Sequence, residues 1–238
     1  MLDFKDQVIV ITGGAGNLGA AVTRAFYLAG ARVAVVDRVR DMAVEIFGDE
    51  IPEGEYCLYV SGNLMDESSV AEVVDTIIKR FDHIDVLVNV AGGYRAGTPL
   101  HETPVDTWDF MMNLNARTVF LTSRAVIPHM IERERGKIIS VGARAALKGT
   151  AQSGPYIASK MAVIRLTESM AAELKDKNIN VNCILPGTID TPDNRKDMPD
   201  ADFDKWVTPD SMANVILFLA SELAKDVNGA AVPVYGRG

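Results

Sequence analysis

The feature that most constrains the fold of this 238-residue chain is a regular alternation of short apolar runs with longer amphipathic segments. Several of the short runs are nearly continuous Val, Ile and Leu, which is typical of parallel strands covered on both faces. Seven runs have strand length: 8–12, 32–36, 56–60, 86–90, 137–141, 181–185 and 231–234. The alternation predicts one doubly wound, Rossmann-like α/β domain over residues 1–238, with a mostly parallel sheet of about seven strands and right-handed crossovers.

Local signals place some of the helices between these strands. Thr103-Pro104 and Thr208-Pro209 each put a hydroxyl before a proline, so we expect Thr103 and Thr208 to be helix N-caps. Two long helices are expected over 105–131 and 156–175. The least regular stretch, 191–207, is rich in Asp, Pro and Lys, and we expect it to form a substrate lid.

Composition excludes several classes of function. The net charge of −8 argues against a nucleic-acid-binding surface, which needs a basic stripe. Cys57 and Cys183 lie singly in apolar runs, and the three histidines are isolated, so no metal site is expected. There is no signal peptide and no apolar stretch long enough to span a bilayer, so we expect a cytoplasmic protein without a membrane partner.

A glycine-rich turn follows the first predicted strand and opens the first helix. It contains G-x-G-x-x-G at Gly14, Gly16 and Gly19, a pattern that lets backbone N–H groups approach a pyrophosphate at a helix N-terminus. Asp37 closes the second strand, where a carboxylate accepts hydrogen bonds from ribose hydroxyls and repels a 2′-phosphate. The turn and the acid together predict NAD(H), while Arg38 and Arg40 keep NADP(H) as the alternative. The site is expected at the carboxyl ends of the strands, where the strand order reverses.

Tyr156 and Lys160 form a second chemical pattern. Residues four apart share one face of a helix, so both side chains can reach one pocket. An ammonium beside a phenol favours the phenolate, and we therefore expect the Tyr156 pKa to be lowered. A phenol tuned in this way can donate or accept a proton during catalysis.

With these motifs in order, the chain resembles the short-chain dehydrogenase/reductase family over its full length. The matching segments are the glycine-rich turn, Asn-Val-Ala-Gly at 89–92, the Tyr156 to Lys160 string, and Pro-Gly at 186–187 followed by Thr191. The resemblance implies that Lys160 holds the nicotinamide ribose and that Thr191 contacts the nicotinamide amide. It also implies a homodimer or homotetramer assembled through the two long helices.

The resemblance further implies an asparagine that anchors a proton-relay water. Asn115 fits this role, and Asn113 is the competing choice, since the string Asn-Leu-Asn offers two registers. The catalytic set is therefore Tyr156, Lys160 and Asn115. The expected cofactor-binding residues are Gly13, Gly14, Gly16, Asn17, Leu18, Gly19, Asp37, Arg38, Asn63, Leu64, Asn89, Ala91, Gly92, Tyr156, Lys160, Pro186, Gly187 and Thr191. The expected substrate pocket comprises Gly93, Tyr94, Ala143, Arg144 and segment 192–206.

Four positions depart from the family pattern. Asn17 stands where a glycine is usual, so the turn must tolerate a side chain, and asparagine accepts unusual backbone angles better than most residues. Asn63 replaces a common aspartate, and Val90 replaces the second asparagine of its motif. The largest departure is Ala143, thirteen residues before Tyr156, where the family supplies a serine that hydrogen-bonds the substrate carbonyl. Loss of such a donor typically costs about 10²–10³ in rate.

The missing serine leaves three interpretations open. A quinonoid substrate is already strongly electrophilic and needs less polarisation, and the strings 91–94, 142–150 and 190–206 resemble quinonoid dihydropteridine reductases, which also carry alanine there. Alternatively, a carbonyl or hydroxyl substrate uses another donor, with Ser140, Ser153 and Arg144 as candidates. In the third interpretation the chain binds nucleotide without catalysis, as a sensor or structural partner.

Overall fold

The strand pattern of the sequence is realised as one parallel sheet. The structure, a computed structural model, describes residues 2–238. Every strand pairs in parallel with its neighbours, in the order β3-β2-β1-β4-β5-β6-β7. The strands are β1 (Val8–Thr12), β2 (Arg32–Asp37), β3 (Cys57–Ser61), β4 (Val86–Asn89), β5 (Gly136–Val141), β6 (Ile179–Pro186) and β7 (Ala231–Val234). The predicted seven-stranded, doubly wound α/β domain is therefore confirmed, with strand boundaries within two residues of the expectation.

The apolar runs form strands because both faces of the sheet are covered. All residues of β1 and β4 are buried, and side chains at alternate positions pack into different layers. Ile9 and Ile11 of β1 pack with Phe26 on one face, while Val10 packs with Ile77 on the other. The strand order reverses between β1 and β4, which opens a crevice at their carboxyl ends.

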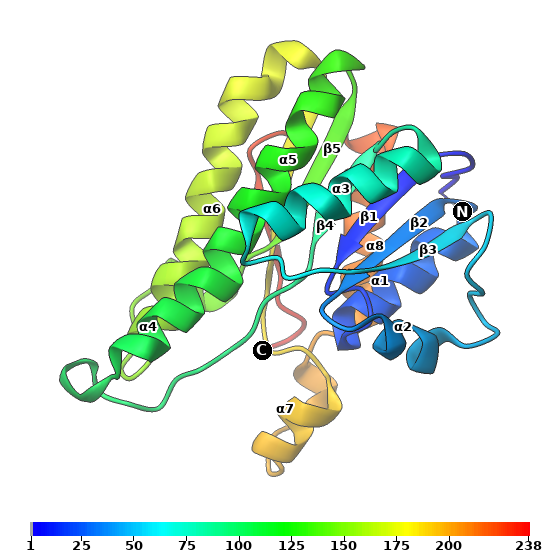
Figure 1. The fold of residues 1–238 in the computed structure, drawn as a ribbon. Helices are drawn as coiled ribbons and strands as arrows, with labels where there is room; N and C mark the ends of the chain where they lie inside the picture. Colours follow the sequence, from blue (N-terminus) through cyan, green and yellow to red (C-terminus); the bar gives the residue numbers. More distant parts are fainter. Residues whose placement is uncertain (1) are drawn as a thin grey trace.

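Helices lie on both faces of this sheet (Figure 1). One face is covered by α1 (Asn17–Leu28), α2 (Arg40–Phe47) and α8 (Pro209–Ala220). The other is covered by α3 (Glu67–Phe81), α5 (Thr118–Glu132) and α6 (Gly154–Leu174). The short helical turns are η1 (Leu100–Glu102), η3 (Arg144–Leu147), η4 (Lys175–Lys177) and η6 (Glu222–Ala224). None of the helices within residues 2–238 combines the length and apolar character needed to cross a membrane.

The two long helices have the expected extents, but the first one is not regular. It runs as α4 (Val105–Met111), a π-helical segment η2 (Met112–Arg117) and then α5. The π segment is a local widening of the helix, a feature often found at functional sites. The second long helix, α6, is continuous and begins just before Tyr156.

One of the two predicted helix caps is correct. Thr208 accepts a hydrogen bond from the Ser211 N–H at 3.2 Å and caps α8. The prediction for Thr103 is wrong, because Pro104 occupies the N-cap position of α4. Thr103 ends the turn η1, and its hydroxyl instead donates to the carbonyls of Thr98 and Pro99.

The segment expected to be irregular, 191–207, contains a short helix. Thr191 caps α7 (Pro192–Asp197), and η5 (Phe203–Lys205) follows. A parallel bridge between Ile189 and Val207 joins the two ends of the segment. Figure 1 shows α7 standing away from the sheet beyond the carboxyl ends of the strands. The segment thus extends away from the sheet, while the β-bridge holds its two ends together. Its action as a lid stays a prediction.

Candidate functional site

A cleft of about 1310 Å³ lies at the carboxyl ends of β1 to β6. The loops that follow these strands line it, together with the start of α6 and part of segment 191–207. The predicted residues that line it are Gly13, Gly16, Asn17, Leu18, Gly19, Asp37, Arg38, Asn63, Leu64, Ala91, Gly92, Gly93, Tyr94, Ala143, Arg144, Tyr156, Lys160, Pro186, Gly187 and Thr191. The sequence motifs therefore converge on one site, although they span most of the chain.

The glycine-rich turn is shaped by close backbone approaches. A Cβ on Gly19 would lie 2.0 Å from the Gly13 carbonyl oxygen, and Gly13 itself has a φ of +63°. Gly16 is the N-cap residue of α1, so the first N–H groups of that helix face the cleft end of the sheet. A tight turn, a helix N-terminus and a large adjoining cleft together fit the pyrophosphate of a dinucleotide.

Asn17 causes no strain in this turn. It is the first residue of α1 and is exposed at the cleft, and it is absent from the residues with positive φ. The turn tolerates this side chain without an unusual backbone angle, because its left-handed position falls on Gly13.

Asp37 is held at the end of β2 beside this turn. Its carboxylate accepts hydrogen bonds from the Ala15 N–H at 3.2 Å and the Arg38 N–H at 2.7 Å. Arg38 lines the cleft, whereas Arg40 is paired with Glu53. Arg38 and Arg40 are the residues that left NADP(H) as an alternative, and of these two only Arg38 lines the cleft.

Tyr156 and Lys160 lie on the same face of α6 and both line the cleft, as their spacing predicts. The Lys160 Nζ is buried and donates to the Val141 carbonyl at 2.8 Å. The ring of Tyr94 stands edge-on to the Tyr156 ring, with centroids 4.8 Å apart. Tyr94 thus packs on the phenol, although 67% of its own surface is exposed.

The pKa of Tyr156 moves in the direction opposite to the expectation. Burial, assisted by the neighbouring Tyr94, raises the pKa of Tyr156 to about 12. Burial also lowers the pKa of Lys160 to about 8, because the apolar surroundings disfavour its ammonium form. Loss of solvation is the largest cause of both pKa shifts, so the protein itself favours the protonated phenol.

Asn115 comes from the π segment and lies directly behind the cleft wall. Its Oδ1 accepts from the Gly93 N–H at 2.9 Å, and its Nδ2 donates to the Gly93 carbonyl at 3.1 Å and to Ser159 Oγ at 3.0 Å. Ser159 in turn donates to the Tyr156 carbonyl. Of the two candidate asparagines, Asn115 is the one that contacts the site. It joins the loop after β4 to the helix that carries Tyr156.

Two further predicted residues, Asn89 and Gly14, support the site from behind without lining the cleft. The Asn89 Nδ2 donates to Ser123 and Ser140 at 3.3 Å, and its Oδ1 accepts from Thr122 at 2.7 Å. A Cβ on Gly14 would lie 2.8 Å from the Val35 side chain, so this glycine allows the turn to pack on β2. Asn89 thus supports the site through hydrogen bonds and Gly14 through close packing, and their contact with a cofactor stays a prediction.

The position of the missing serine carries no hydroxyl. Ala143 is buried and lines the cleft directly before η3. Ser140 is fully buried and bonded to Asn89, while Ser153 is hydrogen-bonded to the Ala151 carbonyl and lies outside the cleft lining. Among the three alternative donors, only Arg144 lines the cleft.

Several lining residues were not predicted from the sequence. They are Met42, Gly62, Met65, Val90, Phe110, Leu114, Thr118, Val141, Gly142, Ala145, Lys148, Thr150, Thr188 and Ile189. Asn194, Asp197 and Met198 also line the cleft, and they belong to segment 192–206, which was expected to shape the substrate pocket. Gly62, Gly142 and Thr188 lie one or two residues after a strand. They could have been predicted, because ligands of open parallel sheets bind at the carboxyl ends of the strands. Phe110 and Leu114 enter from the helix after β4, which no motif marks.

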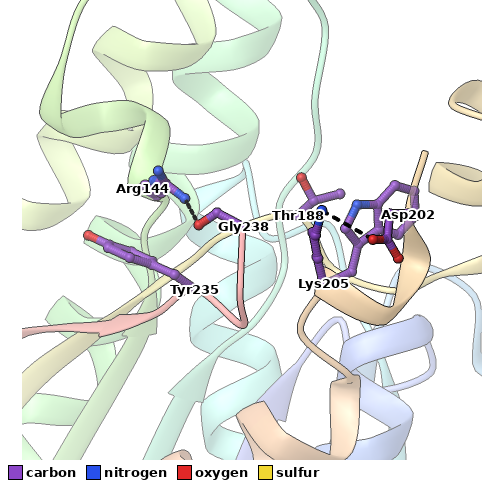
Figure 2. A pocket seen from close by; sticks show the side chains of 7 residues that line it. Arg144, Thr188, Asp202, Lys205, Tyr235 and Gly238 are labelled. Carbon is purple, nitrogen blue, oxygen red and sulfur yellow. Dashed lines mark hydrogen bonds and ion pairs between the residues drawn. The ribbon is translucent and has the colours of Figure 1, made fainter.

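A smaller pocket of about 300 Å³ adjoins the cleft at Arg144 and Thr188. It was not predicted as a separate cavity, although Arg144 and segment 192–206, which supplies Asp202, Lys205 and Trp206, were expected at the substrate pocket. Arg144 and Thr188 line both cavities and form the boundary between them. Figure 2 shows this side pocket, which is lined by Arg144, Thr188, Asp202, Lys205, Trp206, Tyr235 and Gly238. Within residues 2–238, no three His, Cys, Asp or Glu side chains gather as a metal site would require.

Comparisons with known proteins agree with this geometry. A family model described as short chain dehydrogenase matches residues 7–202. The chain is 34% identical over 245 residues to "Dehydrogenase/reductase SDR family member 6" of Danio rerio, covering 97% of this chain and 96% of that protein. It is 33% identical over 242 residues to the 3-oxoacyl-(acyl-carrier-protein) reductase FabG of Thermotoga maritima, covering 98% and 97%. The crystal structure of levodione reductase superposes with a TM-score of 0.90 at 27% identity, covering 98% of this chain and 97% of that one.

Proposed function

Because the chain belongs to the short-chain dehydrogenase/reductase family, an oxidoreductase family, we propose that it is an NAD(H)-dependent enzyme acting on a small molecule. The observation that carries the proposal is that Tyr156 and Lys160 line the same cleft as the glycine-rich turn and Asp37. A bound nicotinamide dinucleotide supplies or accepts the hydride in such a reaction.

Each part of the cleft has a defined task in this proposal. The turn from Gly13 to Gly19 and the N-terminus of α1 bind the pyrophosphate. Tyr156 Oη donates a proton to the substrate during reduction and takes one during oxidation. Lys160 holds the nicotinamide ribose, and Thr191 contacts the nicotinamide amide. Asn115 is a positioning residue that fixes the loop at Gly93 against α6.

The preference for NAD(H) over NADP(H) rests on Asp37. Its carboxylate lies beside the turn, where it would accept from ribose hydroxyls and repel a 2′-phosphate, and Arg40 is already paired with Glu53. Fluorescence titration should show NADH binding at least about tenfold tighter than NADPH. Asp37→Ser should reduce the ratio of NADH affinity to NADPH affinity. An unchanged ratio would show that Asp37 does not set the preference.

For the substrate, we propose a quinonoid compound, with quinonoid dihydropterin as the first candidate. The support is Ala143, which leaves the wall beside Tyr156 without the hydroxyl that polarises an ordinary carbonyl. A quinonoid ring is already electrophilic, so the proton from Tyr156 suffices.

A second candidate is reduction of a carbonyl or oxidation of a hydroxyl. It is favoured by the names of the relatives, which include a 3-oxoacyl reductase and levodione reductase. In this case Arg144, the one of the three candidate donors that lines the cleft, would take the place of the serine.

One assay separates these candidates. NADH oxidation is followed with quinonoid dihydropterin and with a panel of ketones and oxo acids. Faster turnover of the quinonoid supports the first candidate, and faster turnover of a carbonyl supports the second. Tight NADH binding without turnover of any compound would support a non-catalytic nucleotide-binding role and contradict the proposed enzyme.

We also propose that the chain forms a homodimer or homotetramer. Val105 and Trp108 of α4 and Phe120 of α5 are exposed apolar side chains on the helices through which the family assembles. Light scattering after size exclusion should give a molar mass of two or four chains. A molar mass of one chain would refute this proposal. A cytoplasmic location is likewise proposed, in keeping with two cysteines that are free and buried.

A further inference from the structure

The side pocket carries an excess of positive charge in an otherwise acidic chain. The chain has a formal net charge of −8, yet the pocket wall contains two cations, Arg144 and Lys205, and one acid, Asp202. In Figure 2, Arg144 and Tyr235 lie on one side of the pocket and Lys205 with Asp202 on the other, with Gly238 and Thr188 between them. Among the side chains of the pocket, positive charges thus exceed negative ones by one, in a chain that is acidic as a whole.

Arg144 is held in place with hydrogen-bonding capacity to spare. Its guanidinium lies over the Tyr235 ring, 4.8 Å from the centroid, which fixes the plane of the group. Within residues 2–238, its hydrogen bonding is limited to one Nη1 bond to the Gly238 carbonyl, although a guanidinium has five N–H donors. The remaining donors suit the two oxygens of a carboxylate.

The other pocket residues complete an anion site with an apolar approach. Lys205 Nζ forms an ion pair with Asp202 Oδ2 at 3.2 Å. The Thr188 hydroxyl, which also lines the pocket, makes no hydrogen bond within the described residues. Trp206 and Tyr235 supply aromatic walls. A volume of about 300 Å³ suits a short carbon chain ending in a charged group, because it lies at the lower end of small-molecule sites.

The side pocket adjoins the cleft that contains Tyr156. Arg144 directly follows Ala143 and Thr188 directly follows Gly187, and all four residues line the main cleft with Tyr156. A group held at this boundary therefore lies in the wall of the cleft that Tyr156 also lines.

We propose that the substrate carries a carboxylate at the end remote from its reacting carbon, and that Arg144, with Lys205 and Thr188, binds it in the side pocket. This inference rests on the proposed function, since it names a group on the substrate of that same cleft. It holds for a quinonoid and for a carbonyl reacting centre alike, because the two ends of the substrate are recognised separately. The binding energy of the anion positions the reacting carbon at Tyr156.

The test uses a non-reacting probe, so that it does not depend on turnover. Calorimetric titration compares butyrate with butyramide, which has the same carbon skeleton without the charge, both with and without NAD⁺. Butyrate should bind at least about tenfold more tightly, as expected for charge-assisted hydrogen bonds. Arg144→Met should remove most of that preference, and Lys205→Met should reduce it.

Lys196→Met is the matched control. It removes the same charge from α7 but lines neither cavity, so the preference for butyrate should persist. Equal binding of butyrate and butyramide, or a preference that survives both Arg144→Met and Lys205→Met, would overturn the proposal. NADH titration of the same samples checks the nucleotide site. Loss of NADH binding with intact selectivity for butyrate would instead contradict the proposed function alone.

Discussion

Substituting Gly19 with alanine tests whether the glycine-rich turn is shaped by backbone contact. A Cβ at this position would lie 2.0 Å from the Gly13 carbonyl oxygen and 2.8 Å from both the Gly13 carbonyl carbon and Gly14 Cα. All three neighbours are backbone atoms, so no side chain can rotate away. The start of α1 must move, or the turn must open.

The expected cost follows from this geometry. Overpacking of a closely packed site costs about 1–3 kcal/mol, which corresponds to a fall in Tm of about 2–12 °C for a domain of this size. The displaced turn should also bind pyrophosphate poorly, and we expect NADH affinity to fall at least about tenfold. Gly16→Ala is the matched control, because its Cβ would lie 3.3 Å from the same Gly13 oxygen. It should cost less than about 1 kcal/mol.

Both variants are measured by thermal unfolding without cofactor and by NADH fluorescence titration. The account expects Gly19→Ala to be impaired in both assays and Gly16→Ala to stay near the wild-type chain in stability. Similar Tm values and NADH affinities for Gly19→Ala and the wild-type chain would show that the backbone contact does not shape the site.

Three further predictions concern the cleft. Ala143→Ser should change quinonoid reduction by less than about threefold and improve reduction of simple ketones at least about tenfold, since it restores a donor. Equal effects on both substrate types in steady-state assays would refute that reasoning. Tyr94→Ala should move the alkaline limb of the pH–rate profile for reduction to lower pH, because Tyr94 adds to the burial that raises the pKa of Tyr156 to about 12. Tyr94→Phe keeps the ring contact and should shift the limb less, and two unshifted profiles would be inconsistent with this packing. In the cofactor-free chain the pKa of Lys160 is about 8, against the ordinary value of 10.5. From pH 8 to 10.5 the unfolded chain holds more protons on this amine, so its contribution to stability rises with pH. In urea unfolding, the free energy of unfolding of the wild-type chain should therefore rise relative to that of Lys160→Met from pH 8 to 10.5. A constant difference between the two free energies would contradict the lowered pKa of Lys160.

The sheet could be predicted because its residues have few alternatives. A parallel strand covered on both faces is nearly continuously apolar, and the Val, Ile and Leu runs at 8–11 and 86–88 have that property. The spacing of Tyr156 and Lys160 predicted that they share one pocket, and the family resemblance placed that pocket beside the glycine-rich turn. The sheet thus followed from periodicity and order, and the composition of the site followed from the resemblance.

The features that escaped prediction depend on contacts between distant residues. Thr103 looks like a helix cap locally, but the carbonyls of Thr98 and Pro99, which precede η1, accept its hydroxyl. The raised pKa of Tyr156 comes from its burial, with a further contribution from the neighbouring Tyr94, and spacing on a helix does not reveal either. The side pocket draws on loops from three parts of the chain, so no single motif marks it.

The central claim is that Tyr156 transfers the proton in a cleft that binds NADH independently of that phenol. The most direct test follows NADH oxidation with the best substrate of the panel for the wild-type chain and for Tyr156→Phe, together with NADH binding by fluorescence. The account predicts that turnover falls at least about 100-fold in the variant while NADH affinity stays within about threefold. Unchanged turnover in Tyr156→Phe would contradict it.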